Sequence, residues 1–214
     1  MAKRLKIKIC GITDTKSMIK ACSLGIDYIG LVFFKNSPRN VSFDHAQSLV
    51  RYKKSNTKIV ALTVDPSNLL LDKIFEKFKP EYIQLHGNEK PSRCFEIKKK
   101  YKVKIIKSVE VTNFKSILIN LNQFKGIVNT FIFDSPSSLL PGGNGKPFNW
   151  KVLKGNKICH DWLLAGGLNA NNIFKAVKLT NPKGVDISSG LEKIKGKKSP
   201  QLIENFVRKC RNIS

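Results

Sequence analysis

Short apolar runs rich in β-branched residues alternate along the chain with longer stretches of helical period. The runs predict strands at Leu5–Cys10, Tyr28–Phe33, Lys58–Val64, Tyr82–Leu85, Val103–Val109, Asn129–Asp134, Trp162–Ala165 and Gly184–Ile187. Helices are predicted between them at Thr15–Leu24, Phe43–Lys54, Ser67–Phe78, Pro91–Lys100, Asn113–Leu121, Ala170–Lys178 and Ser199–Arg211, with a short turn near Trp150–Leu153. Because the runs are apolar throughout rather than alternating, we expect strands buried on both faces in a parallel sheet.

The number and spacing of these units favour a closed barrel. Eight units in 214 residues average about 27 residues each, near the lower end of the size range of a (βα)8 barrel. An open doubly wound sheet is the alternative, but the first strand ends in Cys10-Gly11-Ile12-Thr13 rather than in the phosphate loop G-x-G-x-x-G. No linker or low-complexity segment divides the chain. We therefore predict an α/β fold, a single-domain (βα)8 TIM barrel over residues 1–214.

The charge of the chain is strongly positive, with 39 Lys+Arg against 15 Asp+Glu and a net charge of +24. Such a balance is typical of nucleic-acid-binding proteins, but these also carry a basic patch or a recognisable module. Here the lysines are spread over the chain, dense only at residues 98–100 and 193–198. We predict that they lie on solvated faces, that the charge attracts at most anionic small molecules, and that no nucleic acid binds.

Cysteine usage and hydropathy indicate a cytoplasmic protein. The five cysteines are odd in number and far apart, with no C-x-x-C and no zinc-ligand spacing, so a reduced compartment and no metal site are expected. No apolar run approaches the ~20 residues of a membrane helix. Lysines interrupt the apolar residues near the start of the chain, whereas a signal peptide has an uninterrupted apolar region there. The residues predicted to pack or to lie on the surface, without a chemical role, are Cys22, Cys94, Cys159, Cys210, His45 and His160.

Polar and glycine-rich groups follow the predicted strands at their carboxyl ends. They are Cys10, Ser37-Pro38-Arg39, Asp65, His86-Gly87, Asp134, Gly166-Gly167 and Ser188-Ser189-Gly190. In a (βα)8 barrel these ends meet at one rim, which is where the chemistry of such barrels takes place. The sequence therefore predicts an active site at this rim.

Seven motifs, taken together and in order, carry a resemblance to a known family. They are Lys8-Ile9-Cys10-Gly11-Ile12-Thr13, Gly30-Leu31-Val32-Phe33 with Ser37-Pro38-Arg39, Gln84-Leu85-His86-Gly87, Phe133-Asp134-Ser135, Gly142-Gly143-Asn144-Gly145-Lys146 with Phe148-Asn149-Trp150, Leu164-Ala165-Gly166-Gly167-Leu168-Asn169 and Gly184-Val185-Asp186-Ile187-Ser188-Ser189-Gly190-Leu191-Glu192. The set resembles the phosphoribosylanthranilate isomerases of tryptophan biosynthesis over nearly the whole chain. The departures are Asn144 for the usual Thr, Asn149 for the usual Asp, and a lysine-rich segment after Glu192.

The resemblance implies an Amadori rearrangement of a phosphorylated aminosugar without metal or organic cofactor. It implies that Asp134 is the general acid and Cys10 the general base. A buried carboxyl gains the raised pKa that a donor needs, whereas a thiol needs a positive environment to ionise. By the same resemblance Arg39 holds the anthranilate end of the substrate. His86 is expected to line the substrate pocket rather than to transfer a proton, with a structural histidine as the alternative. Phosphate binding is expected at Gly166, Gly167, Ser188, Ser189 and Gly190.

The remaining expectations concern the rim and the rival functions. The glycines at 142, 143 and 145 predict a mobile lid, and Asp186 is expected to be a buried supporting group outside the catalytic pair. The chain is expected to be a monomer or a homodimer. Another phosphate-binding barrel is the alternative enzyme, either the aminosugar isomerase of histidine biosynthesis or a pentose-phosphate epimerase. A basic nucleic-acid-binding barrel without catalysis is the alternative from a different class.

Overall fold

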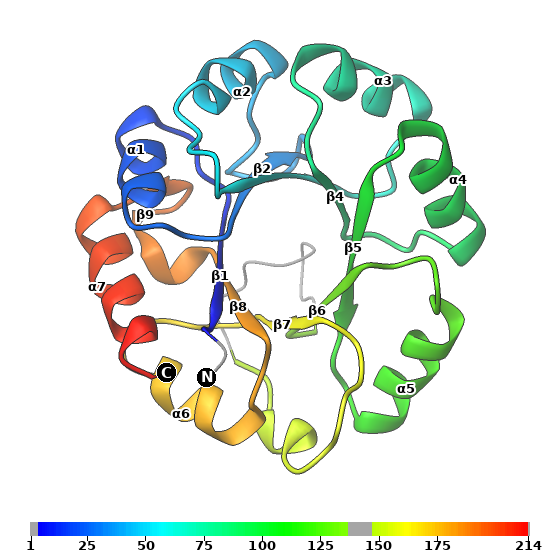
Figure 1. Ribbon diagram of the computed structural model, residues 1–214, viewed down its shortest axis with the longest axis vertical. Coiled ribbons are helices and arrows are strands. Elements are labelled where there is room, and N and C mark those ends of the chain that lie inside the picture. Colours follow the sequence, from blue (N-terminus) through cyan, green and yellow to red (C-terminus); the bar gives the residue numbers. More distant parts are fainter. Residues whose placement is uncertain (1–3, 137–146, 214) are drawn as a thin grey trace.

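The computed structural model describes residues 4–136 and 147–213. Eight parallel strands form a closed barrel in chain order, surrounded by helices (Figure 1). The strands are β1 (Lys6–Cys10), β2 (Tyr28–Phe33), β3 (Lys58–Thr63), β4 (Tyr82–Leu85), β5 (Lys104–Glu110), β6 (Thr130–Asp134), β7 (Trp162–Leu164) and β8 (Gly184–Ile187). The helices are α1 (Thr15–Ser23), α2 (Phe43–Val50), α3 (Asn68–Lys77), α4 (Pro91–Tyr101), α5 (Phe114–Gln123), α6 (Ile173–Thr180) and α7 (Pro200–Arg211), with the 3-10 turns η1 (Trp150–Leu153) and η2 (Ser189–Leu191). The predicted (βα)8 barrel is confirmed.

Strand β1 closes the barrel by pairing with both β2 and β8. Cys10 lies opposite Gly30 on β2, and Lys8 lies opposite Asp186 on β8. Side chains alternate along a strand, so Lys8 and Cys10 point the same way, into the barrel, whereas Ile7 packs in the core between strands and helices. The pairing therefore fixes which side chains of β1 meet those of β8.

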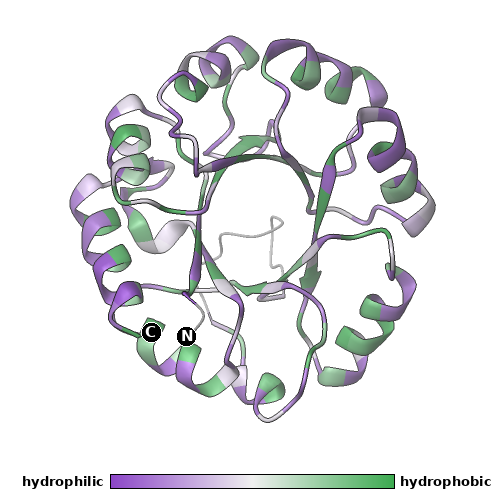
Figure 2. Ribbon diagram, viewed as in Figure 1, coloured by the Kyte–Doolittle hydropathy of each residue, from purple (hydrophilic) through white to green (hydrophobic). Residues whose placement is uncertain are grey.

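The helices turn their apolar sides toward the strands and their polar sides outward (Figure 2). Their starts follow from local capping: Asp14 accepts a hydrogen bond from the Ser17 backbone N–H, and Ser199 caps α7, whose first residue is Pro200. This large core between sheet and helices is separate from a small cluster inside the barrel. The inner cluster contains Tyr28, Val60, Ile106, Ile132, Leu163 and Ala165.

The structure corrects several element boundaries. Helix α2 ends at Val50 rather than at residue 54. Helix α6 begins at Ile173 rather than at residue 170, because the side chain of Asn169 accepts hydrogen bonds from the backbone N–H groups of the residues that precede the helix. The hairpin of β9 (Glu192–Ile194) and β10 (Lys197–Lys198) was not predicted. In residues 4–136 and 147–213, no helix has the length and apolar character to cross a membrane.

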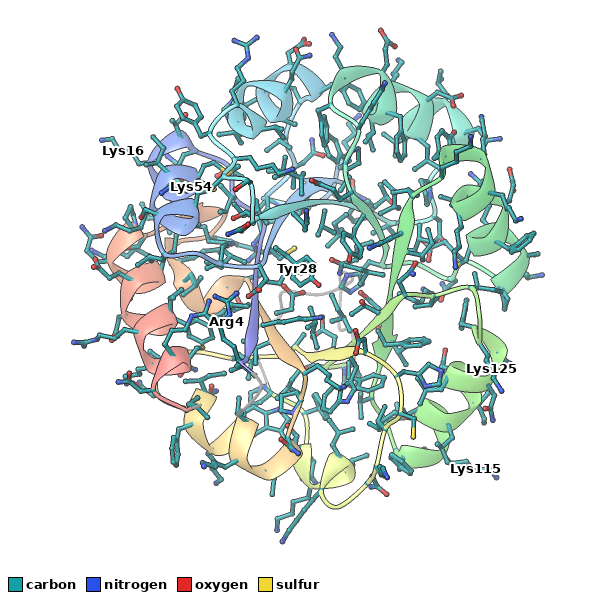
Figure 3. The ribbon with its side chains drawn as sticks, viewed as in Figure 1. Arg4, Lys16, Tyr28, Lys54, Lys115 and Lys125 are labelled. Atoms are coloured by element: carbon teal, nitrogen blue, oxygen red, sulfur yellow. The ribbon has the colours of Figure 1, made fainter. Side chains whose placement is uncertain are left out.

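Within residues 4–136 and 147–213, most lysines are on solvated faces, as predicted, but three are not. Figure 3 shows Lys16 and Lys115 pointing away from the barrel, and both are exposed. Lys8, Lys107 and Lys198 are instead buried, because each is paired with a carboxylate of another strand or loop. The prediction that the lysines are uniformly solvated is therefore wrong for these three.

Two of the smaller predictions also need correction. Cys159, expected to be a packing residue, is exposed, whereas Cys22, Cys94 and Cys210 are buried as expected. His160 is half-buried rather than on the surface, because its ring packs edge-on against Phe131.

Candidate active site

A cavity opens at the carboxyl ends of the barrel strands. Its walls include these predicted site residues: Cys10, Arg39, His86, Asp134, Gly166, Gly167, Ser188 and Ser189. Gly190 is not part of the wall; a Cβ there would lie 2.1 Å from the Leu168 carbonyl oxygen, so this glycine lets the loops after β7 and β8 pack together. Asp65 faces a neighbouring hollow, and the glycines at 142, 143 and 145 lie outside the described residues.

Cys10 ends β1 with its side chain almost fully buried. Strand β2 leaves room for the sulfur only because residue 30 is glycine: a Cβ there would lie 2.8 Å from Sγ and 3.0 Å from the Cys10 Cα. Burial raises the pKa of the thiol, while the ammonium groups of Lys8 and Lys198 act in the opposite direction. The thiol therefore lies in a dry site next to cations.

Asp134 ends the apolar strand β6 and is also buried. Burial raises the pKa of its carboxyl to about 7, against the effect of the Ser135 backbone N–H, which donates a hydrogen bond of 2.8 Å to Oδ1. Asp186 raises this pKa further, and Lys8 lowers it. A carboxyl with this pKa is about half protonated at pH 7, so it can act as a proton donor there.

His86 faces Asp134, with 3.8 Å between Nε2 and Oδ2. Burial and the charges of Lys8 and Lys107 lower the pKa of the imidazole to about 3, so the ring is neutral and the contact is not an ion pair. The amide nitrogen of Gln84 lies 3.2 Å from Nδ1 and donates to the Ser108 hydroxyl at 2.9 Å. This arrangement makes Nδ1 an acceptor and leaves the ring hydrogen on Nε2, on the side of Asp134.

Arg39 is held at the rim by Glu192. Its Nε donates to Oε1 at 2.7 Å and its Nη2 donates to Oε2 at 2.9 Å, and Lys198 donates to the same carboxylate. These bonds outweigh burial and lower the pKa of Glu192 to about 2, so it is ionised. Gly11 is needed beneath the arginine, because it has a φ of +77° and a Cβ would lie 2.5 Å from the Arg39 Cδ. The two-point contact fixes the plane of the guanidinium.

The glycine loops after β7 and β8 form the far wall of the cavity. Gly166 has a φ of +84°, and a Cβ there would lie 2.2 Å from the Ser135 hydroxyl oxygen. Ser188 lies after β8 and donates through its hydroxyl to the Cys10 carbonyl at 3.0 Å. The backbone at Gly166 and Gly167 can thus approach a ligand more closely than a backbone with side chains.

The sequence did not assign roles to four polar side chains around the site: Lys8, Gln84, Glu192 and Lys198. Three of them, Lys8, Gln84 and Glu192, stood within the quoted motifs, and two of these, Lys8 and Glu192, have a partner far away in the chain. Lys8 pairs with a residue 178 positions later, and Arg39 with one 153 positions later. In the part of the chain that the structure describes, no three His, Cys, Asp or Glu side chains cluster as metal ligands would.

The family follows from comparison with known proteins. A family model described as N-(5'-phosphoribosyl)anthranilate (PRA) isomerase matches residues 7–209. The chain belongs to this family. The N-(5'-phosphoribosyl)anthranilate isomerase of Parvibaculum lavamentivorans is 39% identical, over 95% of this chain and 97% of its own length. That of Mesorhizobium japonicum is 40% identical, over 97% and 95%.

The fold agrees with that of a solved member of the PRA isomerase family. The crystal structure of phosphoribosyl anthranilate isomerase from Thermotoga maritima matches this chain with a TM-score of 0.87 and 26% sequence identity. The match covers 97% of this chain and 99% of the other. The family that the motifs resembled is thereby confirmed.

Proposed function

We propose that this chain catalyses the reaction for which the PRA isomerase family is named, with Asp134 as general acid and Cys10 as general base. The substrate is N-(5'-phosphoribosyl)anthranilate, and the reaction is an Amadori rearrangement that turns an aminoaldose into an aminoketose. The observation that carries the proposal is that a thiol and a carboxyl with a pKa near 7 line the same cavity.

The first step opens the sugar ring. The protonated carboxyl of Asp134 gives its proton to the furanose oxygen, the bond from that oxygen to C1′ breaks, and the nitrogen lone pair forms a protonated imine with C1′. The raised pKa of Asp134 supports this role, because an ordinary aspartate is almost fully ionised at pH 7.

The second step moves the double bond. The thiolate of Cys10 takes the proton from C2′, the electron pair of that C–H bond forms the C1′–C2′ double bond, and the imine electrons return to nitrogen. The enolamine then gains a proton at C1′ and loses one from the C2′ hydroxyl to give the ketone. Because the protonated imine itself accepts the electron pair, these steps need neither a metal nor an organic cofactor.

Substrate binding is proposed to use the two ends of the cavity. The edge of Arg39 that Glu192 does not hold is suited to the anthranilate carboxylate, because a planar guanidinium binds carboxylates at two points. The backbone around Gly166, Gly167 and Ser189 is suited to the phosphate, which glycine loops after the last strands of such barrels often bind. His86 contributes the Nε2 hydrogen to the wall between them.

The test is the turnover of freshly made substrate, followed by anthranilate fluorescence. We expect Cys10→Ser and Asp134→Asn each to lower kcat by about two to four orders of magnitude, the contribution typical of general acid–base groups. Cys22→Ser, which changes a buried thiol of α1 away from the cavity, is the matched control and keeps normal turnover. Near-normal turnover in both site variants would overturn the proposal.

A further inference from the structure

Lys8 is a cation buried inside the barrel directly below the cavity. Its side chain has no exposure to solvent, and its Nζ donates to Asp186 Oδ1 at 2.9 Å. Interactions with Asp186 and with the Cys10 thiol outweigh burial and raise the pKa of Lys8, so it is protonated. The ammonium thus contacts one carboxylate and lies next to the thiol.

The packing of the barrel gives no reason for a charge at this place. The side chains that fill the inside of the barrel form an apolar cluster, which includes Val60, Ile106 and Ile132. Burying an ion pair costs desolvation, and apolar side chains of similar size often stabilise a core at least as well. The pair therefore needs an explanation other than stability.

We propose that Lys8 is the positioning residue that allows Cys10 to exist as a thiolate, and that Asp186 competes with the thiolate for its charge. The inference deepens the proposed function, because it explains how a buried thiol could act as the base. When Cys10 loses its proton, the ammonium of Lys8 interacts with two anions, the thiolate and the Asp186 carboxylate. When the thiolate takes the C2′ proton and becomes neutral, the ammonium interacts with the Asp186 carboxylate alone.

Other charges around the thiol come from three further elements. Lys198 of β10 lowers the pKa of the thiol less than Lys8 does and is bonded to Glu192. Arg39, from the loop after β2, is also bonded to Glu192, and Asp134 faces the cavity from β6. Lys198 and Arg39 share one carboxylate at the rim, so Lys8 is the cation whose partner can be changed without disturbing Arg39.

The experiment measures the alkylation of Cys10 by iodoacetamide as a function of pH, with the Cys10 peptide followed by mass spectrometry. The parent protein carries Cys159→Ser, because Cys159 is an exposed thiol. We expect Lys8→Met to shift the alkylation profile upward by at least about one pH unit, which slows labelling about tenfold at a given pH below the pKa. We expect Asp186→Asn, which keeps the ammonium and removes its competitor, to shift the profile downward.

The matched control is Lys107→Met, which removes another buried lysine paired with a carboxylate, Glu89, across the barrel from Cys10. Its alkylation profile stays where the parent's is. An unchanged profile in Lys8→Met, or an upward shift in Asp186→Asn, would overturn the inference. If Lys8→Met does not fold, the result for Asp186→Asn decides alone. An alkylation profile of Asp186→Asn that is not shifted downward would then contradict the inference.

Turnover gives a second readout that a purely structural lysine would not produce. We expect Lys8→Met to lower kcat/KM by the factor by which it slows alkylation, with KM little changed. The two proposals fail separately: full activity in Cys10→Ser would overturn the role of the thiol as base, whereas the alkylation shift reports the coupling of Lys8 to Cys10 whether or not the protein turns over substrate.

Discussion

The two sides of the cavity differ in what sets the pKa of the buried acidic group that each contains. On the β1 side, burial raises the pKa of the Cys10 thiol, and two ammonium groups, from Lys8 and Lys198, oppose it. On the β6 side, burial raises the pKa of Asp134 and the facing imidazole of His86 is neutral, so it adds no charge to oppose burial. Lys8 also lowers the pKa of Asp134, but its effect is smaller than that of burial, of the Ser135 backbone hydrogen bond and of Asp186.

This difference matches what the two groups are proposed to do. A general acid must hold its proton at neutral pH, so burial alone prepares a carboxyl for the task. A general base must lose its proton, so the same burial would disable a thiol unless cations lie beside it. The barrel shields both Cys10 and Asp134 from water, but it places cations mainly beside Cys10.

The largest effect that tests this contrast is the pH dependence of turnover. The active form has Asp134 protonated and Cys10 ionised. Below pH about 7, kcat/KM should rise about tenfold per pH unit as the thiolate fraction grows. Above that pH, Asp134 loses its proton as fast as thiolate forms, so we expect a plateau up to the pKa of the thiol and a fall beyond it.

Asp134→Asn should lower kcat/KM by about two to four orders of magnitude and remove the lower break, so that its residual rate keeps rising through pH 7. Asp44→Asn, at an exposed carboxyl of α2, is the control and keeps the profile of the parent. A break near pH 7 that persists in the Asp134 variant would show that another group sets it.

The second effect separates a lysine that supports the fold from one that serves the thiol. Lys107 donates to the Gly87 carbonyl at 2.7 Å and to Glu89 at 3.0 Å, and Glu89 also binds the backbone N–H of Asp65. Lys107→Met leaves this carboxylate buried without its ammonium, so we expect the free energy of unfolding to fall by about 3–5 kcal/mol in denaturant titrations. Adding Glu89→Gln should restore a large part; a single variant as stable as the parent contradicts this account.

The strands and most of the cavity wall were predictable because their signals are local. An apolar run between turn residues marks a strand, and its last residue marks the rim, which is how Cys10 and Asp134 were found. The lysine-rich hairpin β9–β10 was missed because strands of two or three residues, with charged side chains, have no hydrophobic pattern. Its Lys198 resembled the exposed lysines around it.

Buried polar partners were not predictable for a related reason. The sequence around a lysine in an apolar strand does not indicate whether its side chain reaches solvent or pairs with a carboxylate. Only closure of the barrel brings Lys8 to Asp186, since β1 and β8 are neighbours in space and ends of the chain in sequence. Glu192 meets Arg39 in the same way.

A third and smaller effect concerns the rim on the cationic side. Glu192→Gln weakens the two-point hold on Arg39, and because charge-assisted hydrogen bonds contribute about 1.5–3 kcal/mol, we expect KM to rise about tenfold or more. The same phosphoribosylamine made from aniline, which lacks the carboxylate, serves as the control substrate, and its KM should change little. An equal rise for both substrates would indicate a general loss of structure instead of a misplaced guanidinium.

The smallest effect tests the neutral side. Gln84→Met keeps the length of the side chain but removes the amide hydrogen that faces Nδ1 of His86, so the imidazole can place its hydrogen on either nitrogen. With Nε2 as acceptor, the ring would take a hydrogen bond from the protonated Asp134 and compete with the sugar oxygen for its proton. One neutral hydrogen bond contributes about 1 kcal/mol, so we expect kcat to fall about fivefold at unchanged KM. Ser108→Ala, which leaves Gln84 bonded to His86, is the control. A loss of kcat in Ser108→Ala equal to that in Gln84→Met would mean that the tautomer of His86 does not matter.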